Sequence, residues 1–285
     1  RLWVKHENHT PTGSFKVRGG LVFLAELSRH DALPAGMITA TRGNHGQSIP
    51  YAAARFSVPV TVLVPKGNSV EKNRAMQAWG AQLVEYGRDF DEAREEAGRL
   101  AEERNLMFAP SFHQSLVKGV ATYAHELFTS VNELDTVYVP IGMGSGICGL
   151  ITARDLLGLD TEIVGVVSSH APAFRLSWEA GKLVSTNSAN TFADGMACRA
   201  PIQEPFDIIR AGASRIVEVS DDEVAQAMRL LFAGAHNVAE GAGAAAFAAQ
   251  RKEALENRRV AVILTGGNVD SEVFRTVLTG DTPSP

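Results

Sequence analysis

The sequence predicts an α/β protein with two interleaved domains, each containing a mostly parallel sheet covered by helices. Short β-branched runs alternate with amphipathic stretches along almost the whole chain, which is the pattern of parallel sheets packed between helices. Several of these runs, such as Val137–Ile141, are apolar on both faces, as buried parallel strands are. With 285 residues the chain can form one large domain or two modest ones.

Eight strands and four helices can be located individually. Each strand is a short run rich in Val, Ile and Thr, and each helix has an apolar stripe at helical spacing. The expected strands are Leu2–Lys5, Met37–Ala40, Val60–Val64, Gln82–Tyr86, Thr136–Ile141, Glu162–Val167, Arg215–Val219 and Val260–Leu264. The expected helices are Ser14–Ser28, Asp89–Glu103, His113–Thr129 and Asp221–Phe232. We expect a large domain of residues 1–30 and 114–285, and a small domain of residues 31–113.

The composition excludes several classes of protein. Hydrophobic residues make up 45% of the chain and charged residues 21%, as in ordinary globular proteins. The sequence contains no block of Lys and Arg, so no nucleic-acid partner is expected. It contains no apolar run long enough to span a bilayer, so no membrane partner is expected. Cys148 and Cys198 cannot form a disulfide framework, which fits a reducing cytoplasm. The chain opens at Arg1 and reads as a strand at once, so a preceding segment is expected.

The segment Pro11–Lys16 follows the first strand and begins a helix. Thr12 or Ser14 can cap that helix, and Gly13 allows close approach of the backbone. Lys16 lies among apolar residues, and desolvation there would favour the neutral amine that attacks an aldehyde. This segment alone leaves open a solvated lysine at a helix start.

The turn Thr41–Gln47 connects the strand ending at Ala40 to a helix that runs to Phe56. Backbone N–H groups at such a turn lack partners and attract a carboxylate. The Asn44 amide could reach a ring substituent of a ligand, or it could simply cap the helix. The turn therefore indicates an anion site, with a capping turn as the alternative.

The segment Gly142–Gly149 follows a strand and opens a helix, and its glycines let successive N–H groups point at one phosphate. Gly144 to Gly149 also matches the dinucleotide fingerprint G-x-G-x-x-G. That interpretation needs an acid at the end of the next strand, which here ends in Val167 and Ser168. A single phosphate is therefore favoured. Thr265, after the last strand, either caps a turn or faces a ligand.

Taken in this order, the segments resemble the fold-type II pyridoxal-phosphate enzymes, which share the fold of the tryptophan synthase β subunit. The similarity is to the threonine/serine dehydratase and serine racemase branch, and it covers essentially the whole chain. Pro11–Gly19 resembles the Schiff-base segment, Gly43–Gln47 the substrate-carboxylate loop and Val139–Gly146 the glycine-rich phosphate loop. Thr191–Gly195 and Ala239–Gly241 are also similar to family segments.

The resemblance implies that pyridoxal 5'-phosphate is held as a Schiff base on Lys16, whose freed amine removes the α-proton. Loss of the β-hydroxyl then gives a 2-oxo acid and ammonia. A neutral Thr265 hydroxyl facing the pyridine nitrogen makes the ring a weaker electron sink, which favours prompt elimination. The implied cofactor-binding residues are Phe15, Lys16, Asn44, Gly142, Met143, Gly144, Ser145, Gly146 and Thr265. The implied substrate-binding residues are Thr41, Arg42, Gly43, Asn44 and His45.

Three departures from the family pattern matter. Arg42 stands where serine racemases place a serine, and its permanently charged guanidinium is a poor proton-transfer base, which argues against racemisation. Arg42 could instead pair with a second carboxylate of the substrate, or could brace the loop. Val167 and Ala173 replace the acids of an optional cation loop, so no metal is expected. The chain ends at Pro285, soon after the Thr265 segment, so no regulatory domain is expected.

The sequence thus predicts a lyase of the threonine/serine dehydratase type, acting on a hydroxy amino acid as a cytoplasmic homodimer. Within the family, racemisation, β-replacement and other β-eliminations stay open, including those of 3-hydroxyaspartate or a hydroxyectoine-derived substrate. A non-catalytic nucleotide-binding module built on the glycine loop is the alternative from another class. Such a module would lack the yellow colour, bleached by borohydride, of a lysine Schiff base.

Overall fold

The computed structural model describes the whole chain, residues 1–285, and divides it into two compact units. Unit 1 consists of Arg1–His9 and Val120–Pro285, and unit 2 of Thr10–Gly119. Each unit is an α/β structure with its own parallel sheet, so the predicted fold class is confirmed. The boundaries differ from the predicted ones, because residues 10–30 and 114–119 belong to unit 2.

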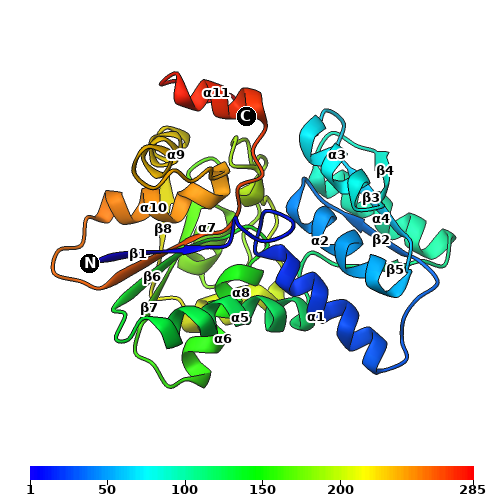
Figure 1. Cartoon of the computed structure of the whole chain (residues 1–285), viewed down its shortest axis with the longest axis horizontal. Coiled ribbons are helices and arrows are strands. Elements are labelled where there is room, and N and C mark those ends of the chain that lie inside the picture. Colours follow the sequence, from blue (N-terminus) through cyan, green and yellow to red (C-terminus); the bar gives the residue numbers. More distant parts are fainter. The chain divides into compact units, whose positions relative to one another are not determined.

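Unit 1 is built on a five-stranded parallel sheet of order β1-β9-β6-β7-β8 (Figure 1). Strands β6 and β9 in its middle are buried along their whole length, which explains their apolar sequences. The strands are β1 (Leu2–His6), β6 (Thr136–Pro140), β7 (Glu162–Ser168), β8 (Arg215–Val219) and β9 (Val260–Leu264). All of them were predicted, with ends that differ by one residue at most.

Helices cover both faces of this sheet, with α9 and α10 on one side and α6 and α8 on the other (Figure 1). The helices are α5 (Gln114–Ser130), which contains the unit boundary, α6 (Ser145–Leu156), α7 (Ala173–Ala180), α8 (Gln203–Gly212), α9 (Asp221–Ala235), α10 (Gly241–Glu253), α11 (Ser271–Leu278) and the 3₁₀ turn η2 (Asp194–Met196). None of the helices in the chain combines the length and apolar character that a membrane span requires.

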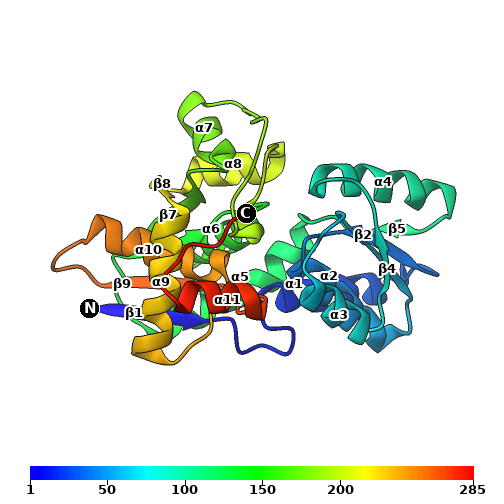
Figure 2. The ribbon, with the colours of Figure 1, turned by 90° about the horizontal axis from the view of Figure 1, so that it is seen from above.

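Unit 2 is built on a four-stranded parallel sheet of order β4-β3-β2-β5. Helices α1 and α2 lie on one face and α4 lies on the other, as Figure 2 shows. The strands are β2 (Met37–Ala40), β3 (Val60–Val64), β4 (Gln82–Glu85) and β5 (Met107–Phe108). The helices are α1 (Lys16–Arg29), α2 (Asn44–Ala53), the 3₁₀ turn η1 (Ala54–Phe56), α3 (Val70–Ala78) and α4 (Phe90–Glu103).

Close packing against α2 and α5 explains why α1 belongs to unit 2. The Ser48 hydroxyl of α2 donates a hydrogen bond to the Lys16 carbonyl oxygen at 2.6 Å. A Cβ at Gly20 would overlap the same hydroxyl, and a Cβ at Gly19 would lie 3.0 Å from the Leu116 carbonyl oxygen. The backbones approach so closely only because glycine occupies these positions. Local sequence patterns carry no sign of this contact.

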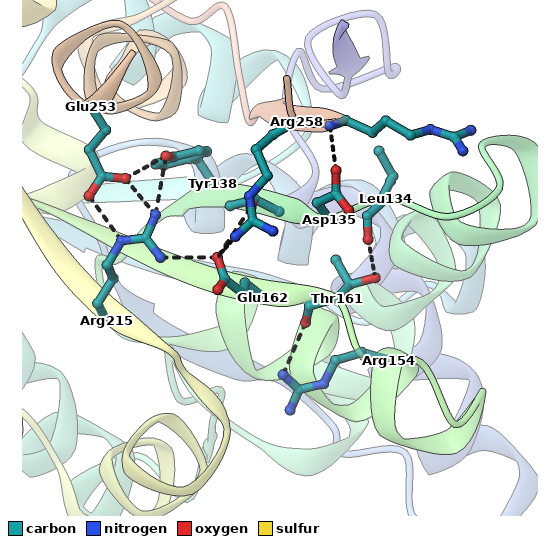
Figure 3. Close-up of polar contacts among 11 residues, drawn as sticks. Leu134, Asp135, Tyr138, Arg154, Thr161, Glu162, Arg215, Glu253 and Arg258 are labelled. Carbon is teal, nitrogen blue, oxygen red and sulfur yellow. Dashed lines mark hydrogen bonds and ion pairs between the residues drawn. The ribbon is translucent and has the colours of Figure 1, made fainter. Parts of the chain in front are cut away.

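A charged network closes the amino-terminal edge of the unit 1 sheet (Figure 3). Arg215, the first residue of β8, donates to both carboxylate oxygens of Glu253 at 2.9 and 2.6 Å, and to Glu162 at 3.2 Å. The hydrogen bonds from Arg215 lower the pKa of the Glu253 carboxyl. Bidentate pairs of this kind fix geometry as well as charge. The network therefore ties the end of α10 to the starts of β7 and β8, at the edge opposite the motifs described next.

Candidate active site

Two of the predicted motifs of unit 1 leave the same edge of its sheet. Strand β6 ends at Pro140 and leads into the glycine loop, Gly142–Gly146, and β9 ends at Leu264 and leads to Thr265. Because β6 and β9 are parallel neighbours, both segments emerge from their carboxyl ends. This edge of an open parallel sheet is where α/β proteins bind ligands. Thr265 is buried there, with 3% of its surface exposed.

The conformation of the glycine loop depends on glycine at two positions. Gly144 has φ +97°, a left-handed conformation, and a Cβ there would lie 2.7 Å from Pro205 Cβ. A Cβ at Gly142 would overlap the Gly195 carbonyl oxygen. The Tyr123 hydroxyl donates to the Gly146 carbonyl oxygen at 3.0 Å. The loop is thus held at both ends by contacts within unit 1.

The same loop forms the start of α6. Gly144 is the N-cap residue, and no side chain caps the helix. The backbone N–H groups at the start of a helix, together with the helix dipole, favour an anion at this position. This geometry can hold a phosphate, as the sequence predicted for the segment.

The Thr265 segment is held by the start of α10. The backbone N–H of Glu240 donates to the Gly266 carbonyl oxygen at 3.1 Å. A Cβ at Gly243 would overlap that same oxygen, so the segment and the helix are in close contact. Thr265 therefore occupies a fixed, buried position at the carboxyl edge of the sheet.

In unit 2, Lys16 is the first residue of α1 and follows a tight turn. The Gly13 N–H donates to the Thr10 carbonyl oxygen at 2.9 Å, and the Thr10 hydroxyl donates to the Ser14 carbonyl oxygen at 2.8 Å. The N-cap position is Phe15, which offers no side-chain cap, so the expected capping by Thr12 or Ser14 is corrected. Lys16 is half-buried, and its Nζ lies 4.9 Å from the centroid of the Phe15 ring.

The Thr41 hydroxyl organises the loop that connects β2 to α2. It accepts hydrogen bonds from the backbone N–H groups of Gly43 at 2.9 Å and of Gly46 at 3.3 Å. Asn44 is the first residue of the helix and does not occupy the capping position. A Cβ at Gly46 would overlap the Thr41 methyl group, so this loop too requires a glycine.

Lys16 and this loop are held together by the packing of α1 on α2. The hydrogen bond from Ser48 fixes the Lys16 backbone, and His45 lies on the same helix as Ser48. His45 is buried, and its Nε2 lies 3.5 Å from the Ala109 carbonyl oxygen. Burial, assisted by the nearby Lys16 charge, lowers the pKa of His45 to about 3. The imidazole is therefore neutral at neutral pH. Lys16 and the loop both belong to unit 2.

The buried His45 predicts a pH dependence of stability. Above about pH 6.5 the imidazole is neutral in both the folded and the unfolded chain. Between about pH 6.5 and pH 3, His45 is protonated in the unfolded chain but stays neutral in the folded protein. Acidification in this range therefore destabilises the fold. We expect the free energy of unfolding, from denaturant titrations, to decrease by about 1.4 kcal/mol per pH unit in this window because of His45 alone.

The comparison of two variants isolates this contribution. His45→Gln should decrease the slope of unfolding free energy against pH by about 1.4 kcal/mol per pH unit, which corresponds to the uptake of one proton on unfolding. His125→Gln replaces an exposed histidine and should leave the slope unchanged. Equal slopes for wild type and His45→Gln would show that His45 titrates normally in the folded protein.

The two unit 2 segments contain polar atoms that are buried without a hydrogen-bond partner, among them Ser14 Oγ, Arg42 Nε and Gln47 Nε2. A buried donor left unpaired costs about 1–3 kcal/mol, so such groups in native proteins are rare and mark sites with a further partner. Their gathering in the segments that contain Lys16 and the carboxylate loop indicates a ligand-binding surface.

The predicted site residues fall into two sets. Unit 2 carries Phe15, Lys16 and Thr41–His45, and unit 1 carries Gly142–Gly146 and Thr265. Their individual roles remain predictions. Sequence reasoning missed the residues that support them: Gly20 and Ser48 behind Lys16, and Tyr123 and Gly195 behind the glycine loop. Only Gly195 left a signal, because it ends the Thr191–Gly195 segment that resembles the family.

The family model described as pyridoxal-phosphate dependent enzyme matches residues 1–266. An L-threonine ammonia-lyase from Geobacter sulfurreducens is 36% identical over 97% of this chain and 69% of the relative. An L-threo-3-hydroxyaspartate ammonia-lyase from Saccharomyces cerevisiae is 32% identical over 100% of this chain and 88% of the relative. The structure of the processed form of threonine deaminase isoform 2 from Solanum lycopersicum has a TM-score of 0.90 at 29% identity, covering 98% of this chain and 83% of that one.

Proposed function

The chain belongs to the pyridoxal-phosphate-dependent enzyme family, and from this premise we propose that it is an ammonia-lyase of the threonine/serine dehydratase type. It eliminates the β-hydroxyl of a hydroxy amino acid and releases a 2-oxo acid and ammonia. The observation that carries the proposal lies in unit 2, where a half-buried lysine and a carboxylate-binding loop are fixed to each other by the Ser48–Lys16 hydrogen bond.

The residues present fit pyridoxal phosphate. Its aldehyde needs an amine, and Lys16 supplies a half-buried one at the start of α1. Its phosphate needs several N–H groups, and the glycine loop leads into the start of α6, where a Cβ at Gly142 would overlap the Gly195 carbonyl oxygen. When bound, the cofactor would withdraw electrons from the α-carbon of the substrate.

We assign the protein groups the following roles. The Lys16 amine would hold the cofactor and would take the α-proton of the substrate. The N–H groups at the start of α2 bind the substrate α-carboxylate and so orient the α-hydrogen. The glycine loop would hold the phosphate of the cofactor, and Thr265 would offer its hydroxyl to the cofactor ring. The substrate loses its β-hydroxyl as water, and the released enamine hydrolyses to the 2-oxo acid and ammonia.

We also propose that the enzyme acts in the cytoplasm as a homodimer and without a metal. Both cysteines are free and buried, as is usual in a reducing compartment. Closed dimers are the commonest oligomers of this kind of protein, and sedimentation of the purified protein tests this state. The buried side chains of Val167 and Ala173 offer no oxygen ligands where the family's optional cation loop has acids.

The proposed activity predicts equimolar release of ammonia and 2-oxo acid from at least one of L-threonine, L-serine and L-threo-3-hydroxyaspartate. The rate should be the same with and without a chelator, because no metal takes part. Activity lost in chelator and restored by magnesium would overturn the metal-free part. Absence of ammonia from all three substrates, with racemised or β-substituted amino acid as the only product, would overturn the elimination itself.

A further inference from the structure

We propose that Arg42 binds a second anionic group of the substrate, so that the preferred substrate is a β-hydroxy dicarboxylic amino acid. The inference rests on the proposed function, because it concerns the substrate of the same site.

The guanidinium of Arg42 has no partner within unit 2. The residue is half-buried, and its Nε is buried without a hydrogen-bond acceptor. Arg42 forms no ion pair and no other hydrogen bond. A guanidinium cannot lose its charge at any working pH, so its partial burial has a cost that an acceptor must offset.

Other partly buried arginines of this chain show what a structural arginine does. Arg154 donates to the carbonyl oxygens of Gly212 at 3.0 Å and Thr161 at 3.3 Å. Arg215 binds the Glu253 carboxylate through two nitrogens. Each of them ties two elements together. Arg42 donates to no carbonyl oxygen and binds no carboxylate. No contact therefore supports the alternative in which Arg42 braces its loop.

The loop does not need such a brace. Its backbone is fixed by the Thr41 hydroxyl, which accepts from two N–H groups, and by the close fit of Gly46 against Met76 and Thr41. Arg42 is therefore not needed to fix this loop, and its Nε donor is unused. In the same unit, Ser14 and Gln47 also have buried donors without a partner. Like Arg42, they could donate to a bound ligand.

The chemistry of the missing partner follows from the donor. One carboxylate suffices for the N–H groups at the start of α2, which is the assigned place of the α-carboxylate. The planar guanidinium is matched to a further carboxylate, which it can bind through two parallel hydrogen bonds. A methyl group in that place would leave Arg42 unpaired. The loop should therefore discriminate between a carboxylate and a methyl group on the substrate β-carbon.

A matched pair of substrates tests this discrimination. L-threonine and L-threo-3-hydroxyaspartate differ only in a methyl group and a carboxylate on the β-carbon. We expect wild type to prefer the dicarboxylic substrate in kcat/KM. Arg42→Gln should decrease kcat/KM for hydroxyaspartate by roughly tenfold to a hundredfold, mainly through KM, and should affect threonine little. Arg42→Lys keeps the charge without the fork and should be intermediate.

Arg74→Gln is the matched control, because Arg74 is exposed on α3 and the variant loses the same charge. Its ratio of kcat/KM values for the two substrates should equal that of wild type. An unchanged ratio in Arg42→Gln would overturn the assignment of Arg42 while leaving the ammonia-lyase activity in place. Ammonia release from no hydroxy amino acid would instead overturn the proposed function.

Binding without turnover gives an independent readout. L-aspartate and L-2-aminobutyrate form the same carboxylate–methyl pair and lack the β-hydroxyl that leaves. Titration of wild type, followed by the cofactor absorbance or by calorimetry, should give tighter binding of L-aspartate, and Arg42→Gln should remove the difference. Equal affinities of the two ligands in wild type would overturn the inference even if Arg42→Gln does not fold.

Discussion

Replacement of Lys16 by alanine is expected to abolish the yellow colour that borohydride bleaches and to decrease ammonia release by about a thousandfold or more. The variant loses the amine that attaches the cofactor and, in the same group, the base that takes the α-proton. The fold should persist, because Ser48 binds the backbone oxygen of residue 16 and not its side chain. Absorbance spectra and ammonia assays of the purified variant measure both effects.

The exposed Lys66 provides the control for this prediction. Lys66→Ala removes a lysine from the same unit, outside the proposed site, and should keep both colour and activity. If Lys16→Ala keeps the bleachable band, another lysine attaches the cofactor and the assignment of Lys16 fails. If the variant is colourless but as active as wild type, the proposed role in proton transfer fails.

Replacement of Gly142 by alanine is expected to weaken cofactor binding strongly and to lower stability by about 1–3 kcal/mol. The added Cβ would overlap the Gly195 carbonyl oxygen, a backbone atom that cannot turn aside as a side chain can. The loop must therefore shift, so that the N–H groups at the start of α6 no longer point toward one phosphate. Titration of the apoprotein with pyridoxal phosphate and thermal unfolding measure the two effects.

Gly98→Ala separates this steric effect from the general effect of replacing glycine. Gly98 lies within α4, and a Cβ there meets nothing within 4 Å. Alanine at an open helical position should stabilise the protein by about 0.5–1 kcal/mol and leave cofactor binding unchanged. If Gly142→Ala binds the cofactor as tightly as wild type, the glycine loop is not the phosphate site.

The fold was predictable where burial leaves a local pattern. Buried parallel strands such as Val60–Val64 and Val260–Leu264 are continuous apolar runs, and the structure places them at those residues. Helix α10 was missed because its Gly/Ala-rich sequence is buried on nearly all sides and shows no apolar stripe. Strand β5, with two residues, is too short to leave any pattern.

The site was predictable as motifs but not as an arrangement. Glycines and polar residues at strand ends pointed to the loops after β2, β6 and β9, because parallel sheets bind ligands there. The unit boundary depends on contacts between residues distant in sequence, such as Gly20 with Ser48. The sequence could not decide whether Arg42 pairs with a group of the protein or with the substrate. Only the folded loop reveals that no acid of unit 2 lies beside Arg42.

Peptide mapping after borohydride reduction tests the central claim most directly. Reduction fixes the cofactor to the lysine that holds it, and trypsin does not cleave after a modified lysine. The account predicts one modified peptide, His6–Arg18, with the cofactor mass on Lys16. A cofactor mass on any other lysine, or an unmodified Lys16 in protein that had been yellow before reduction, would contradict it.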